Sequence, residues 1–112
     1  MVKVKILKTS TGDIVSFEVK GHSNFAEHGQ DIVCSGISAV AQTAVLGLNQ
    51  FINNPPKLKI EEGYLSCSLP GSLTLDERGR ANIVLKTMAL GMEMIAQSYP
   101  QNIRLVWQIV DH

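Results

Sequence analysis

Apolar residues recur along this chain at two different spacings, and the order in which these spacings follow one another most constrains its fold. An apolar residue at every second position buries one face of a strand, and one at every third or fourth position buries one face of a helix. Two segments with the strand spacing precede one with the helical spacing, this block repeats, and a last strand-like segment follows. The pattern predicts strand, strand, helix, strand, strand, helix and strand at residues 2–6, 15–19, 37–52, 58–60, 65–69, 81–95 and 103–109.

Turn formers and helix breakers separate these segments. Residues 9–13 and 61–63 are short polar or glycine-containing clusters between paired strand patterns, so each predicts a hairpin turn. The proline pair at 55–56 ends the first helix because proline cannot continue one. Thr74 and Glu77 have the spacing of a capping box, which predicts that the second helix begins there.

This order of elements predicts an α+β fold. We expect a mostly antiparallel sheet of about five strands with two helices packed on one face. A length of 112 residues is usual for one domain, and an apolar fraction of 45% can fill its core. We therefore interpret residues 1–112 as a single domain.

The charge and the N-terminal sequence limit the partners and the compartment. Ten basic residues balance ten acidic ones, which argues against direct nucleic-acid binding but leaves room for a local basic patch. Lysines interrupt residues 1–20, so they do not form a signal peptide, and the longest apolar runs are too short to predict a membrane span. We expect a cytoplasmic protein with no membrane partner, in which Cys34 and Cys67 are free thiols.

Cys34 is the strongest candidate for a reactive group. It stands where a short apolar stretch, residues 32–34, leads into the first helix, and the amides at a helix start stabilise a negative charge. That position favours the reactive thiolate. The alternative is an ordinary buried thiol, which is the commoner environment of free cysteine. Asp31 and Ser38 favour the reactive interpretation, because both are polar and Ser38 follows Cys34 by one helical turn.

A cysteine nucleophile needs a base, and two histidines compete for that role. His22 directly follows a strand, and His28 lies within the polar segment 21–30, which we interpret as a loop that could close over a bound peptide. The residues alone leave these two nearly tied. Asp31 could orient an imidazole, as the third member of a triad does, or be a plain helix-entry carboxylate stabilised by the helix dipole.

The remaining cysteine and histidine indicate no further chemistry. Cys67 shares a strand face with Leu65 and Leu69, which predicts a core position, and His112 ends the chain. The spacing of cysteines and histidines does not predict a metal site, and nothing in the sequence calls for a cofactor.

The pair Gly21-His22 and residues 31–38, which read Asp-Ile-Val-Cys-Ser-Gly-Ile-Ser, resemble the signature of the ribosomal-processing cysteine protease family called Prp. The resemblance extends over essentially the whole chain. It implies a catalytic pair of His22 and Cys34, rather than His28, and an active-site motif that includes Gly21, Asp31 and Ser38.

The same resemblance implies a substrate and an assembly. Members of this family remove a short N-terminal extension from the large-subunit ribosomal protein numbered twenty-seven, cut after an aromatic residue, and form homodimers. The chief alternative is a ribosome-associated peptide-binding protein without catalysis. A thiol redox sensor ranks last, since no resolving cysteine lies near Cys34 in sequence.

Overall fold

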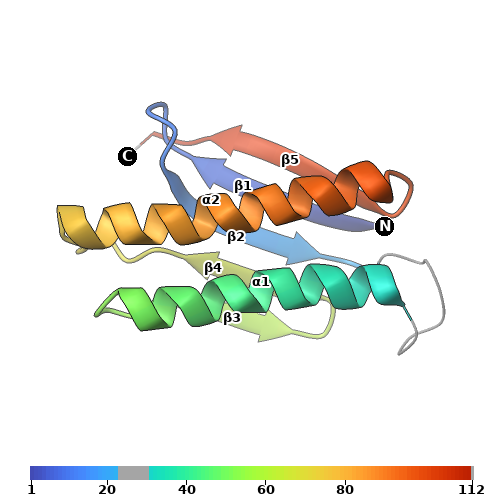
Figure 1. The fold of residues 1–112 in the computed structure, drawn as a ribbon, viewed down its shortest axis with the longest axis horizontal. Helices are drawn as coiled ribbons and strands as arrows, with labels where there is room; N and C mark the ends of the chain where they lie inside the picture. The colour runs from blue at the N-terminus through green and yellow to red at the C-terminus, as the bar shows by residue number, and fades with distance from the viewer. Residues whose placement is uncertain (23–30, 112) are drawn as a thin grey trace.

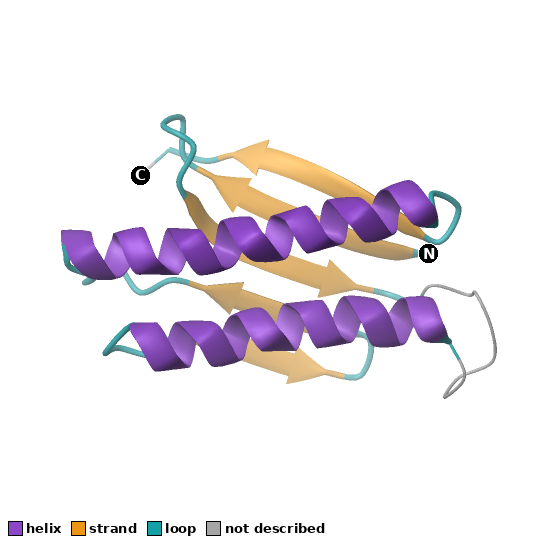
Figure 2. Cartoon of the chain, viewed as in Figure 1, coloured by secondary structure: helices purple, strands orange, loops and turns teal. Residues whose placement is uncertain are grey.

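The computed structural model describes residues 1–22 and 31–111, and its helices and strands follow the predicted order (Figures 1 and 2). Each predicted segment corresponds to one element, with ends that differ by a few residues. The elements are β1 (Val2–Lys8), β2 (Ile14–Lys20), α1 (Ile32–Phe51), β3 (Lys57–Glu61), β4 (Tyr64–Ser68), α2 (Leu75–Ser98) and β5 (Ile103–Ile109).

The five strands form one sheet in the order β3-β4-β2-β1-β5. Three of its four pairings are antiparallel, whereas β1 and β5 are parallel, so the sheet is mixed rather than wholly antiparallel. The parallel pair arises because α2 carries the chain back along the sheet, and the strand after such a crossover runs in the direction of the strand before it. In the same way α1 connects β2 to β3.

Both helices cover one face of the sheet, as Figure 2 shows, and the core lies between the two layers. The buried side of β1 alternates as predicted, with Val2, Val4 and Ile6 pointing to the helices. Cys67 of β4 is also buried, at 2% exposure, which confirms the predicted core position. Buried residues from all these layers pack in a single cluster.

The prediction for β2 was wrong at one position. Val15 was expected to share a buried face with Phe17 and Val19, but Ile14 is buried instead and Val15 is half-buried. The register with β1 shifts between Leu7 and Lys8, so Val15 is an extra residue without its own partner. A bulge of this kind reverses the alternation of side chains beyond it, and hydrophobicity alone did not indicate it.

The two edge strands bury less than their apolar patterns predict. Leu58 and Ile60 of β3 remain exposed, as do Trp107 and Ile109 at the end of β5. Figure 1 shows α2 crossing the sheet obliquely, near the start of β5 and away from its end. Trp107 is instead contacted by Lys8, whose Nζ lies 5.0 Å from the ring centroid.

The face of the sheet away from the helices carries a row of cations. Lys3 is paired with Lys20 on one side and with Arg104 on the other, so three like charges stand side by side across β5, β1 and β2. Within residues 1–22 and 31–111 the one salt bridge is between Lys59 and Glu61. A local basic patch is therefore present although the net charge is zero.

Helix α1 has no charged residue and is long and apolar enough, by length and composition alone, to cross a membrane. Core helices of globular domains pass the same test. Here Val33, Ile37 and Leu48 face the sheet and are buried by it, which is the arrangement of a core helix.

Candidate active site

Cys34 lies in the first turn of α1, which begins at Ile32. The apolar residues 32–34, expected to lead into the helix, are themselves helical. Asp31 is the N-cap, and its Oδ1 accepts a hydrogen bond of 2.9 Å from the Cys34 amide. The thiol is half-buried in the first turn of the helix, at the end where the backbone amides have no intrahelical acceptors.

The amide of Cys34 is therefore already used by the helix cap. The amides of Ile32 and Val33 also belong to the first turn, where a helix provides no internal acceptor. These two groups can donate to an anion at the helix start. Asp31, 7% exposed, has a clear structural role as a cap in addition to any effect on an imidazole.

His22 directly follows β2 and Gly21. Gly21 has a φ of +99°, and a side chain there would meet the carbonyl oxygen of Met1 at 2.7 Å. Its amide donates to the carbonyl of Gly63, at 2.8 Å. The backbone on the N-terminal side of His22 is thus fixed by the sheet and by the turn between β3 and β4.

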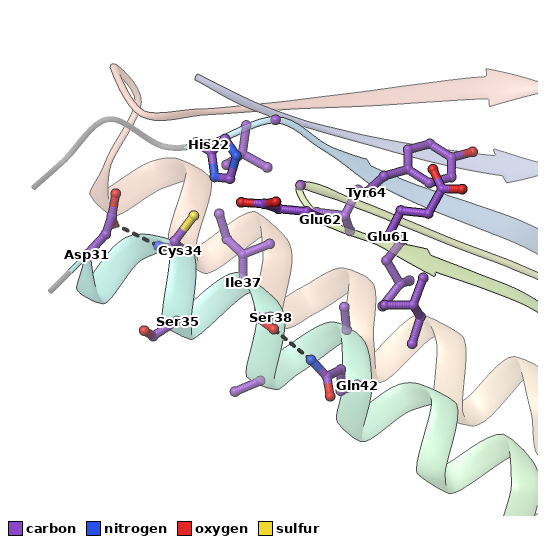
Figure 3. Close-up of a pocket in the computed structure, with 18 of the residues that line it drawn as sticks. His22, Asp31, Cys34, Ser35, Ile37, Ser38, Gln42, Glu61, Glu62 and Tyr64 are labelled. Atoms are coloured by element: carbon purple, nitrogen blue, oxygen red, sulfur yellow. Dashed lines mark hydrogen bonds between the residues drawn. The ribbon is translucent and has the colours of Figure 1, made fainter. Parts of the chain in front are cut away.

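The structure brings His22 and Cys34 to the same place. Both side chains line one groove, and Figure 3 shows the sulfur and the imidazole pointing toward each other from α1 and from the end of β2. His28 and His112, and the proposed closing loop beyond His22, lie outside the described residues.

The groove runs between α1 and the β3–β4 hairpin and has a volume of about 1070 Å³. Cys34 and His22 are at one end of it, and Gln42 and Glu61 are farther along (Figure 3). Ser38, predicted to lie on the same side of the helix as Cys34, is on its rim and accepts a 2.8 Å hydrogen bond from Gln42. A groove of this shape can hold an extended peptide across the thiol.

Sequence reasoning missed one wall of this groove. Glu61, Glu62, Gly63 and Tyr64 were interpreted only as a turn and the start of a strand, yet all four line the groove. They reach the site because β4 pairs with β2, which places Tyr64 opposite Lys20. Only this long-range pairing could have identified them.

The second thiol has the opposite environment. Burial raises the pKa of the Cys67 thiol to about 11, so it stays protonated at neutral pH. Among the described residues, no group of three or more histidine, cysteine or acidic side chains could hold a metal ion. The groove is thus a site built around a single accessible thiol, Cys34.

Comparisons with known proteins agree with this description. A family model for the cysteine protease Prp matches residues 1–104. The ribosomal processing cysteine protease Prp of Bacillus subtilis (strain 168) is 37% identical over 112 residues, which cover 98% of this chain and 100% of that protein. The protein of the same name from Staphylococcus aureus (strain NCTC 8325 / PS 47) is 28% identical over 105 residues, covering 94% and 97%.

Solved structures match the fold as well. The essential ribosomal processing protease Prp from S. aureus with a covalently linked product peptide superimposes with a TM-score of 0.85 at 26% identity, over 96% of this chain and 100% of that one. Its complex with a substrate peptide gives a TM-score of 0.80 at 25% identity, with the same coverage. With the family model spanning nearly the whole sequence, this chain belongs to the Prp family of cysteine proteases.

Proposed function

We propose that this protein is an endopeptidase that processes a ribosomal protein precursor, with Cys34 as nucleophile and His22 as general base. The observation that carries the proposal is the placement of the Cys34 sulfur at the N-terminal end of α1, facing His22, at one end of a long apolar groove. The names of the relatives support ribosomal processing as the setting.

In the proposed reaction His22 accepts the proton of the Cys34 thiol, and the thiolate attacks the carbonyl carbon of the scissile bond. A carbon–sulfur bond forms while the carbonyl oxygen takes up negative charge. Collapse of this intermediate breaks the carbon–nitrogen bond, and His22 returns the proton to the leaving amine. Water, deprotonated by His22, then hydrolyses the thioester and releases the free thiol.

The negative oxygen of the intermediate needs donors that are already in place. The Cys34 amide donates to Asp31, so we assign this role to the amides of Ile32 and Val33. Asp31 supports the reaction by holding the first helical turn, and Gly21 by holding the backbone before His22. Ser38 contributes a polar contact for the peptide on the groove rim.

The groove suits an apolar segment, because Ile37, Ala41, Leu46, Ile60 and Leu65 line it. We propose that the segment is the short N-terminal extension of the large-subunit ribosomal protein numbered twenty-seven, cut after an aromatic residue, as the family resemblance implies. On the same ground we propose a homodimer. We further propose that the protein is cytoplasmic and, because its charge is balanced, that it makes no direct nucleic-acid contact. The free thiols accord with a reducing compartment.

The test is cleavage of a synthetic peptide that spans such an extension, followed by mass spectrometry. Wild type should give two products cut after the aromatic residue, and Cys34→Ala should give none while it still binds the peptide. A matched peptide with alanine in place of the aromatic residue should be a poorer substrate. Equal cleavage by wild type and Cys34→Ala would refute the mechanism, and binding without cleavage by wild type would favour the non-catalytic alternative.

A further inference from the structure

The turn between β3 and β4 lies directly against His22, although the two are far apart in the sequence. A Cβ atom built on Gly63 would stand 3.0 Å from Nε2 of His22, 3.4 Å from Cε1 and 3.7 Å from Cδ2. The imidazole therefore occupies the space that any other residue at this position would fill with its side chain. Figure 3 shows the turn, with Glu62, beside the ring.

A second contact ties the same turn to the backbone before the histidine. The carbonyl of Gly63 accepts a 2.8 Å hydrogen bond from the Gly21 amide. One residue thus contacts both the backbone that carries His22 and the edge of its ring. Its own φ of +68° lies in the left-handed region that favours glycine.

We propose that Gly63 is a positioning residue for His22 in the proposed proteolytic reaction. Its carbonyl fixes the backbone of Gly21, and its lack of a side chain lets the ring lie against the turn where it faces Cys34. This inference rests on the proposed function, because it matters only if His22 acts on Cys34. The β3–β4 hairpin thus supports the general base, His22, although Gly63 itself has no reactive group.

A methyl group on Gly63 forces the ring to move, because 3.0 Å is shorter than the usual contact of a Cβ atom. The imidazole is a terminal side chain and can rotate away while the fold remains. A Cβ at 3.0 Å makes the ring give by a few tenths of an ångström, which is less than the displacement of about 1 Å that costs on the order of 10²-fold in rate. We therefore expect Gly63→Ala to lower kcat about 3- to 10-fold and to change KM less than about 2-fold, since the groove itself is kept.

The chain contains a matched control. Gly12, in the β1–β2 turn, also has a positive φ, of +95°, but a Cβ there would meet no atom within 4 Å. Gly12→Ala imposes comparable backbone strain without touching the site. It should lower the thermal midpoint by about as much as Gly63→Ala does and leave kcat unchanged.

Two further measurements complete the test. Neither should change if Gly63 has only a structural role. The NMR resonance of the His22 ring Hε1 should shift in Gly63→Ala and stay in place in Gly12→Ala. The rate at which iodoacetamide alkylates Cys34 at neutral pH should fall in the first variant only. If Gly63→Ala is too unstable to assay, Gly63→Asn replaces it, because asparagine tolerates a positive φ while its Cβ still meets the ring.

The outcomes separate this inference from the proposed function. Loss of cleavage in Cys34→Ala and His22→Ala together with a normal kcat in Gly63→Ala would overturn the inference and leave the protease mechanism standing. An effect confined to KM, or equal losses in the Gly63 and Gly12 variants, would also overturn it. Full cleavage by Cys34→Ala would instead refute the proposed mechanism.

Discussion

The two helices begin in the same way and use the third position of the first turn for different purposes. In α1 the N-cap is Asp31 and the third position is Cys34, whose amide donates to the cap. In α2 the N-cap is Thr74 and the third position is Glu77, whose amide also donates to the cap, at 3.1 Å. Helix starts favour negative charge at this position. One helix places a permanent carboxylate there and the other a thiol.

The side chains at this third position differ in role: Glu77 stabilises the fold, and Cys34 lines the candidate active site. Glu77 accepts hydrogen bonds from the amides of Thr74 and Asn53, at 3.2 and 2.8 Å, and so joins the start of α2 to the end of α1. Cys34 has no such structural acceptor role, and its side chain lines an open groove. The same backbone geometry therefore stabilises the fold at one end of the molecule and lies beside the proposed nucleophile at the other.

Substitutions at Cys34 and Glu77 should have the largest effects, the first on cleavage and the second on stability. Cys34→Ser should lower cleavage by more than about 10³-fold, because a hydroxyl is a far weaker nucleophile at neutral pH, and leave the thermal midpoint nearly unchanged. Glu77→Gln should do the reverse. Peptide cleavage and thermal melts of both variants test this, and a comparable loss of activity in Glu77→Gln would contradict the separation.

The two thiols should differ strongly in reactivity. With a pKa of about 11, Cys67 is about 10⁻⁴ thiolate at pH 7, and it is buried, so iodoacetamide should give one adduct per native chain, at Cys34. Intact-protein and peptide mass spectrometry locate the adduct. In urea both thiols should react, which is the control for access. Preferential labelling of Cys67 in the native protein would show that the helix start does not activate Cys34.

Substitution of the two N-cap residues, Asp31 in α1 and Thr74 in α2, provides a further comparison of the two helix starts. Asp31→Ala and Thr74→Ala should each cost about 1 kcal/mol in the free energy of unfolding, since each leaves one N-terminal amide without its acceptor. Only Asp31→Ala should also lower kcat, because it loosens the turn that carries Cys34. Denaturant unfolding and steady-state kinetics measure the two effects. Equal kcat values in the two variants would mean that the Asp31 cap is purely structural.

Acid should weaken the α2 start through Glu77. Hydrogen bonds from the amides of Asn53 and Thr74 lower the pKa of its carboxyl below the usual value. A carboxyl whose pKa is lower in the folded state contributes stability above its unfolded pKa and loses it as pH falls toward the folded value. The stability of Glu77→Gln should therefore vary less with pH than that of wild type below about pH 5. Parallel curves for the two proteins would rule out this contribution.

The sequence was most informative where neighbouring residues decide the structure. The alternation in β1 and the capping box of Thr74 and Glu77 depend on local geometry, and both are confirmed. The extra residue Val15 and the exposure of Ile60 depend on pairing and on where a helix crosses the sheet, which no local pattern records.

The same distinction applies to the site. Cys34 could be predicted because a helix start is visible in the sequence. His22 had a slight advantage over His28 because it follows a strand, and the family signature decided between them. The turn at Gly63 was predicted, but its contact with His22 could not be, because the turn reaches His22 only after β2 and β4 have paired. Its contribution to the site exists only in the assembled sheet.

The row of Arg104, Lys3 and Lys20 should make the stability of this neutral protein depend on salt. Like charges that face one another across paired strands repel, and the zero net charge of the chain does not cancel a repulsion confined to one face. Ions at about 0.15 M shorten the reach of that repulsion to roughly 8 Å. Moderate ionic strength should therefore stabilise the sheet slightly, and the pairings of β1 with β2 and with β5 should be weakest in dilute buffer.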